Sequence, residues 1–149
     1  MATSGKMYSM TAIEFVDVAT ARGVRIVVSG IAPNPWSEAT KGFFRLAQVP
    51  VLAVRLMREA TEITAWTGTD NVPVVLHDAE PARTHLTAIA ALAARLAGPD
   101  VLIPEDVEAR EETMGLLDAI AGEDGVGWNA RLAMVHASVT SGGTRVFQP

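Results

Sequence analysis

The side chains best suited to chemistry lie in two short segments, residues 34–37 and 77–80. In the first, Asn34 and Ser37 supply an amide and a hydroxyl that can donate hydrogen bonds. Asn34 followed by Pro35 is also typical of a helix N-cap with proline at the first helical position, so capping alone explains this pair. In the second segment, His77 lies beside two acids, and a solvated turn is a more common origin of such a cluster than an acid–base pair.

Several familiar kinds of site are excluded by residue types. The chain has no cysteine, which excludes disulfides, thiolate metal sites and a dithiol redox pair. His77, His85 and His136 are dispersed, and none has an acid at a ligand spacing such as His-Glu-x-x-His. Neither a Gly-x-Ser-x-Gly motif nor a phosphate-binding loop occurs. We therefore expect no metal, and any chemistry must use other groups.

Charge and hydropathy limit the partners. The net charge of −5 would repel a phosphate backbone, and the 12 lysines and arginines form no cluster to offset it. No apolar run approaches the ~20 residues of a membrane span, and the first ten residues lack the apolar block of a signal peptide. We expect a cytoplasmic protein that binds neither nucleic acid nor membranes.

An alternation of strands and helices must position the two segments. Residues 24–29 are a β-branched run typical of a buried strand, and residues 51–56 are a second short run rich in strand-forming residues. Apolar residues at helical spacing between them predict a helix over 36–47. So short a connection favours a right-handed crossover between parallel strands. A helix over residues 58–67 and a third strand over residues 72–76 follow.

Three more helices complete the pattern. The first spans residues 86–97 and ends at Gly98-Pro99, where the glycine is predicted to form a left-handed cap. Two others are predicted over residues 105–121 and 128–139. Residues 1–23 fit either a short amphipathic helix or an extended arm. A chain of 149 residues favours one main core.

The order β-α-β-α, then Val72-Pro73 opening a strand, then a helix ending in Ala-Leu-Ala-Ala-Arg-Leu, resembles the N-terminal domain of glutathione S-transferases. Ile103-Pro104 and Gly125-Val126-Gly127-Trp128 are similar to the start of that family's helical C-terminal domain. The resemblance implies an α/β protein with an N-terminal arm (1–23), a thioredoxin-like domain (24–98; β-α-β-α-β-α) and two helices of a partial all-α domain (99–149). It also implies that the chain is a fragment or a truncated product.

The same resemblance implies a set of site residues. The loop after the first strand would stabilise the glutathione thiolate, and Asn34 and Ser37 align best with that role, since donors at a helix N-terminus lower a thiol pKa. Val72-Pro73 is implied to be cis, with the Val72 backbone bonding glutathione; an ordinary trans proline is the alternative. Trp36 would wall the ligand site, or else pack in the core.

The sequence departs from the family at the γ-glutamyl end of glutathione. An acid followed by serine usually binds there, whereas this chain has His85 and Leu86, and leucine cannot make that bond. Arg83 and Thr84, one turn earlier, offer a charge and a hydroxyl for a carboxylate. The glutathione-binding set implied is therefore Trp36, Val72, Pro73, Arg83, Thr84 and His85.

Two functions follow from these residues. The first is a glutathione S-transferase-like enzyme that conjugates or reduces small electrophiles, with glutathione as co-substrate. The alternative is a non-catalytic binding or interaction module that has lost the glutathione site, in which His85-Leu86 simply packs. A homodimer is expected in either case, because the last two helices would leave apolar side chains such as Met114, Leu117, Leu132 and Val135 partly exposed.

Overall fold

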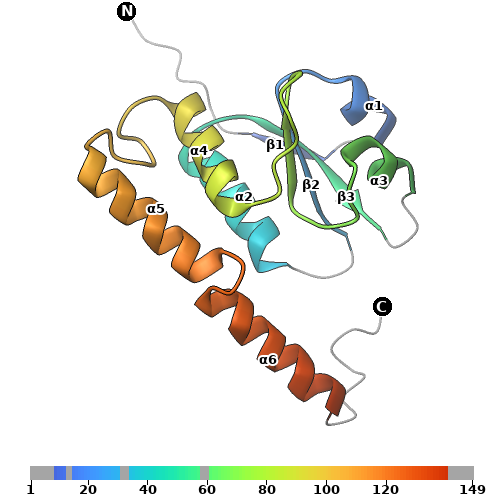
Figure 1. Ribbon diagram of the computed structural model, residues 1–149. Coiled ribbons are helices and arrows are strands. Elements are labelled where there is room, and N and C mark those ends of the chain that lie inside the picture. Colours follow the sequence, from blue (N-terminus) through green and yellow to red (C-terminus); the bar gives the residue numbers. More distant parts are fainter. Residues whose placement is uncertain (1–8, 13–14, 31–33, 58–60, 141–149) are drawn as a thin grey trace, which may run out of the picture.

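The computed structural model describes residues 9–12, 15–30, 34–57 and 61–140. They form a mixed α/β structure in which helices cover both faces of a four-stranded sheet, as predicted at the level of fold class (Figure 1). The elements are β1 (Met10–Ala12), α1 (Phe15–Thr20), β2 (Val24–Ser29), α2 (Pro35–Leu46), β3 (Val51–Leu56), α3 (Thr61–Thr67), β4 (Val74–His77), α4 (Leu86–Ala97), α5 (Val107–Ala121) and α6 (Val126–Thr140).

The sheet has the strand order β1-β3-β2-β4. β2 and β3 are parallel, as predicted, and Val24 is opposite Val51 in their register. β4 is antiparallel to β2, with Val27 opposite Val74 and Val24 opposite His77. The beginning of β4 therefore lies at the same end of the sheet as the carboxyl end of β2 and the start of α2, which brings residues 34–37 near Val72-Pro73.

Each face of the sheet carries its own apolar cluster. Ile26 and Val28 of β2 point to the face covered by α2 and α4, where they pack with Phe44 and Ile89. Val27 points to the face covered by α1 and α3 and packs with Val18, Ile63 and Val74. Because Ile26 and Val28 face one side of the sheet and Val27 faces the other, the β-branched run at 24–29 requires helices on both sides.

Two local features differ from the sequence prediction, and a third lies partly outside the described residues. The edge strand β1, parallel to β3, was not predicted, because its three residues are all exposed and show no apolar alternation. Gly98 has the positive φ expected of it, 101°, but its ψ of 178° is extended, so the left-handed cap predicted there is wrong. The start of the predicted helix at residue 58 falls outside the described residues, and α3 is observed from Thr61.

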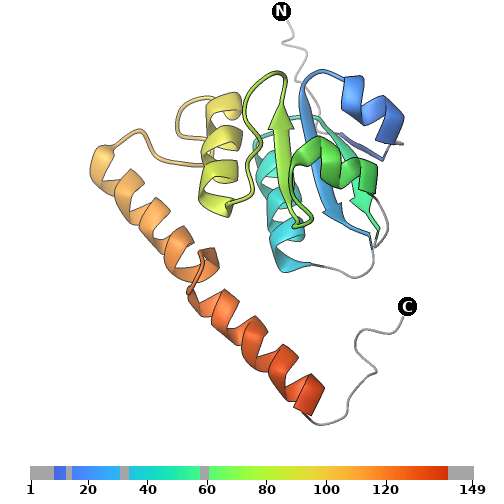
Figure 2. The same cartoon turned by 45° about the vertical axis from the view of Figure 1, so that its right-hand side comes forward.

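α5 and α6 contain no buried residue. Figure 2 shows them following one another almost end to end and projecting past the sheet and its covering helices. Leu132 is 50% exposed, and Met114, Leu117 and Val135 are partly exposed, as expected from their sequence pattern. The helices touch the α/β part mainly through α4 and the start of α2.

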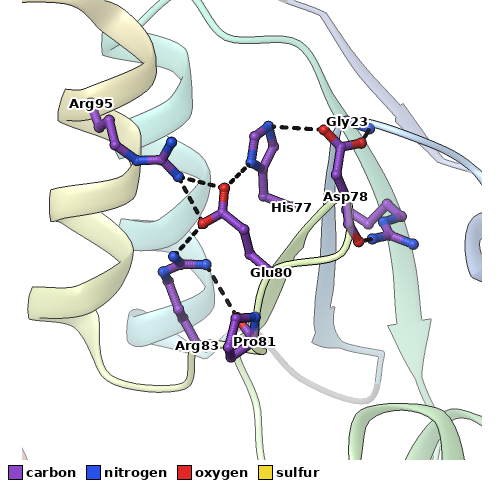
Figure 3. A network of polar contacts seen from close by, with 8 residues as sticks. Gly23, His77, Asp78, Glu80, Pro81, Arg83 and Arg95 are labelled. Atoms are coloured by element: carbon purple, nitrogen blue, oxygen red, sulfur yellow. Dashed lines mark hydrogen bonds and ion pairs between the residues drawn. The ribbon is translucent and has the colours of Figure 1, made fainter.

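The segment at residues 77–80 is neither a simple solvated turn nor an open acid–base pair. The Glu80 carboxylate accepts hydrogen bonds from Arg83 (2.6 Å) and Arg95 (2.7 Å) and contacts His77 Nδ1 at 2.7 Å (Figure 3). Asp78 accepts the Gly23 N–H at 2.8 Å. This ion-pair cluster ties the loop after β4 to α4 on one side and to the start of β2 on the other.

The cluster predicts a pH dependence of stability. Hydrogen bonds from His77, Arg95 and Arg83 lower the pKa of Glu80 from 4.5 to about 2. A carboxyl whose pKa is lowered by folding contributes stability that is complete above its unfolded pKa and lost as pH falls. Unfolding monitored between pH 5 and pH 2 should therefore show a decline in stability that Glu80→Gln makes smaller, while Glu112→Gln, at an exposed acid of α5, leaves it unchanged. An identical slope in wild type and Glu80→Gln would contradict this.

Candidate functional site

Most of the predicted site residues border one cleft, at the end of the sheet where β2 ends and β4 begins. We call it the α2 cleft, and its volume is about 180 Å³. In open α/β sheets this edge is where ligands usually bind. Its lining residues are Asn34, Trp36, Asn71, Val72, Pro73, Thr84, His85, Leu86, Thr87, Asp118, Ala121, Gly122, Glu123, Trp128 and Arg131.

Asn34 is the N-cap of α2. Its Oδ1 accepts the backbone N–H groups of Trp36 at 3.0 Å and Ser37 at 3.2 Å, and Pro35 occupies the first helical position. The predicted capping role is confirmed. The amide nitrogen Nδ2 makes no hydrogen bond to the described part of the chain, so it can still donate to a ligand in the cleft.

Val72-Pro73 has the cis peptide bond that the resemblance implied. Both residues line the α2 cleft together with Asn34. The Val72 N–H already donates to Asn71 Oδ1 at 3.0 Å, which leaves the Val72 carbonyl as the backbone group available to a ligand. A ligand that also used the Val72 N–H would have to displace the Asn71 side chain.

Trp36 both packs and lines the cleft. It lies against the core cluster between the sheet, α2 and α4, and its Nε1 donates to the carbonyl oxygen of Ala121 at 2.9 Å. The Trp128 ring meets it edge-on at 5.8 Å, and the Arg131 guanidinium lies 5.5 Å from the Trp36 ring centroid. Such cation–π and edge contacts stabilise by about 0.5–2 kcal/mol each. The Trp36 side chain thus joins α2 to α5 and α6.

Two predicted site residues are placed elsewhere. Ser37 is 1% exposed, and its Oγ accepts the Ser29 N–H at 3.4 Å instead of lining the cleft. Arg83 bonds Glu80 and the carbonyl oxygen of Pro81 and belongs to the ion-pair cluster. Neither is positioned to contact a ligand in the α2 cleft, because each is held by bonds to groups outside it.

Thr84 and His85 do line the cleft, and both are exposed. His85 is the N-cap residue of α4 but makes no side-chain capping bond. Leu86 is 6% exposed and belongs to the core cluster with Phe44 and Ile89. The idea that His85-Leu86 simply packs therefore holds for Leu86 and not for His85.

The helical part adds charged and aromatic residues that the sequence reasoning did not assign to the site. Asp118 and Glu123 bring acids to the cleft, and Arg131 brings a cation that forms no ion pair within the described ranges. Trp128 and Arg131 are three residues apart and so share a helix face, which is the one local signal that could have paired them. Nothing in the sequence shows that this face meets Trp36.

The described residues contain no group of three or more potential ligand side chains that could hold a metal ion. Among the described helices, none combines the length and apolar character needed to cross a membrane. Comparisons of the chain with protein-family models, curated proteins and solved structures found no match. A functional assignment therefore rests on the geometry of the α2 cleft.

Proposed function

We propose that this chain is a glutathione S-transferase-like protein whose α2 cleft binds glutathione and conjugates it to, or uses it to reduce, small electrophiles. Its α/β part would be a thioredoxin-like domain over residues 24–98. The parallel pair β2 and β3 joined through α2, the antiparallel β4, and α4 support that arrangement. An isolated antiparallel bridge between Val75 and Arg83 supports it further, because it continues the sheet past β4.

The observation that carries the proposal is that Asn34 and Val72-Pro73 border one cleft at the start of α2. A thiol bound there would lie near the positive end of a 12-residue helix and near the Asn34 Nδ2 donor. Both favour the thiolate and lower the thiol pKa. The backbone donors of Trp36, Ser37 and Glu38 are already used by Asn34, so they add no direct bonds to the sulfur.

The charged residues of α5, α6 and the turn between them offer a substitute for the acid–serine pair that the chain lacks. A γ-glutamyl end carries a carboxylate and an ammonium group. Arg131 could bind the carboxylate, and Asp118 or Glu123 the ammonium, while Thr84 adds a hydroxyl on the facing wall. In this proposal the helical part, and not the start of α4, recognises the zwitterionic end of the thiol.

A non-catalytic binding module is the second candidate. It is favoured by the donors that are already satisfied: the Val72 N–H by Asn71, and the first N–H groups of α2 by Asn34. Such a module would bind a ligand in the α2 cleft without activating a thiol.

Substitutions at Asn34 separate catalysis from capping. Asn34→Ala should abolish most thiol transfer and lower the free energy of unfolding by about 1 kcal/mol, because it removes the N-cap. Asn34→Asp keeps a capping oxygen but replaces the amide donor with a negative charge that repels a thiolate. It should therefore lose activity at nearly wild-type stability.

Activity is measured with glutathione and a chromogenic aromatic halide, and glutathione binding by calorimetry. Full activity in Asn34→Asp would assign Asn34 to capping alone. Calorimetric binding of glutathione without turnover in the wild type would favour the binding module.

We also propose a homodimer. Exposed apolar side chains run along both terminal helices, among them Leu116 at 57%, Ile120 at 59%, Leu132 at 50% and Met134 at 68%. A second copy would remove this surface from water. Light scattering should give twice the chain mass, and Leu132→Lys combined with Met134→Lys should shift the distribution to monomer. A concentration-independent monomer in the wild type would refute the dimer.

A further inference from the structure

A second, larger cavity lies at the other end of the sheet from the α2 cleft. We call it the basal cavity; it has a volume of about 620 Å³ and is formed by the starts of β2 and β3, the end of β4, and the last turns of α2 and α4. We propose that it is a second binding site, specific for a small amphipathic anion such as a carboxylate or sulfonate with an apolar body.

The size and the walls of the basal cavity fit such a ligand. Pockets for small molecules usually have volumes of about 300–1,000 Å³ and mainly apolar walls with a few polar groups. Here Val49, Leu52, Leu96 and Ala97 form apolar walls contributed by several separate elements. Apolar side chains from separate parts of the chain therefore surround the basal cavity but leave it open to a ligand.

The polar rim carries one cation, Arg22. Arg22 is exposed at the rim and forms no ion pair within the described ranges, although its charge helps to lower the pKa of the nearby Asp78 carboxyl. His77 also lines the cavity, and among the described residues no aspartate or glutamate does. A cationic rim over an apolar wall is complementary to an amphipathic anion, and it stands out in a chain whose net charge is −5.

The ion-pair cluster engages the acids beside this rim and holds the His77 side chain in place. Figure 3 shows Glu80 between Arg83, Arg95 and the His77 ring, and Asp78 beside Gly23. The two acids nearest the cavity are thus already engaged, and their contacts fix the His77 ring, whose side chain remains 17% exposed. Neither acid lines the cavity, and both nitrogens of the His77 ring face these acids, so Arg22 is the cation that an incoming anion meets.

The basal cavity and the α2 cleft are separate sites. β2 is six residues long and runs from one to the other, a distance of about 20 Å at ~3.3 Å per residue. The two share no lining residue. The inference therefore does not depend on the proposed function.

Amide NMR with 8-anilinonaphthalene-1-sulfonate as the probe tests the proposal. Saturable shifts are expected at Gly23, Gln48 and Ala97, while the indole signals of Trp36 and Trp128, which report on the α2 cleft, stay in place. Arg22→Gln should weaken binding about three- to tenfold by removing one charge-assisted contact, and Arg22→Lys should restore most of it. Ala97→Phe should abolish binding by filling the cavity.

The exposed helices need a control, because this probe also binds apolar surfaces. Leu132→Lys combined with Met134→Lys should leave the shifts at Gly23 and Ala97 unchanged. Shifts centred on α6 or on the Trp36 and Trp128 indoles would overturn the proposal. So would affinity unaffected by Arg22→Gln, or the absence of saturable shifts up to about 1 mM probe, which corresponds to only ~4 kcal/mol of binding.

Discussion

Trp36→Ala is expected to detach α6 from the α/β part and to lower the free energy of unfolding by about 3–5 kcal/mol. The substitution removes the hydrogen bond to Ala121, the edge contact with Trp128, and the stacking surface under Arg131, together with packing against the core. α6 has no buried residue of its own, and its contacts with Trp36 hold it to the α/β part, whereas α5 also packs on α4. The α2 cleft should lose its wall at the same time.

Hydrogen exchange and chemical denaturation measure this effect. Amides of α6 should exchange faster in Trp36→Ala, and Trp36→Phe, which keeps a ring but not the indole N–H, should be intermediate. Trp66→Ala is the matched control on the opposite face of the sheet, where Trp66 packs edge-on against Phe15 at 5.8 Å and beneath Arg25. It should lower stability without accelerating exchange in α6. Equal exchange of α6 in both alanine variants would contradict the joining role of Trp36.

Phe44→Ala is expected to lower the free energy of unfolding by about 3–5 kcal/mol, because it leaves a cavity between α2, α4 and the sheet. Phe44 is 0% exposed and is among the largest fully buried side chains of the described core. The free energy of unfolding of a single domain is usually about 5–15 kcal/mol, so Phe44→Ala should remove a large part of it.

The neighbouring Phe43 supplies the control. It is only partly buried and lies at the edge of the same cluster. Phe43→Ala should lower stability by about 1–2 kcal/mol, in proportion to the smaller apolar area that it buries. Urea denaturation of the two variants measures the difference. Equal losses would mean that α2 is not seated on the sheet as described.

Much of the α/β part was predictable because its signals are local. The β-branched runs at 24–29 and 51–56, and the breaks at Pro50 and at Gly98-Pro99, set strands and helices to within a few residues of the observed bounds. β1 was missed, because an exposed three-residue strand has no pattern of its own and exists through its pairing with β3. The left-handed cap predicted at Gly98 was wrong for a similar reason. The conformation at the end of a helix depends on where the following chain goes, which the local sequence does not show.

At the candidate site, the sequence by itself determined Asn34 as the cap of α2, because a cap needs only a polar oxygen two and three residues before the N–H groups that it accepts. It also placed Val72-Pro73 at the start of a strand. Only the tertiary structure decided which side chains share the α2 cleft. It assigned Arg83 to Glu80, buried Ser37, and brought Ala121, Trp128 and Arg131 to Trp36, whose bond to Ala121 spans 85 positions. Contacts at that separation depend on how whole helices pack, and no local spacing encodes them.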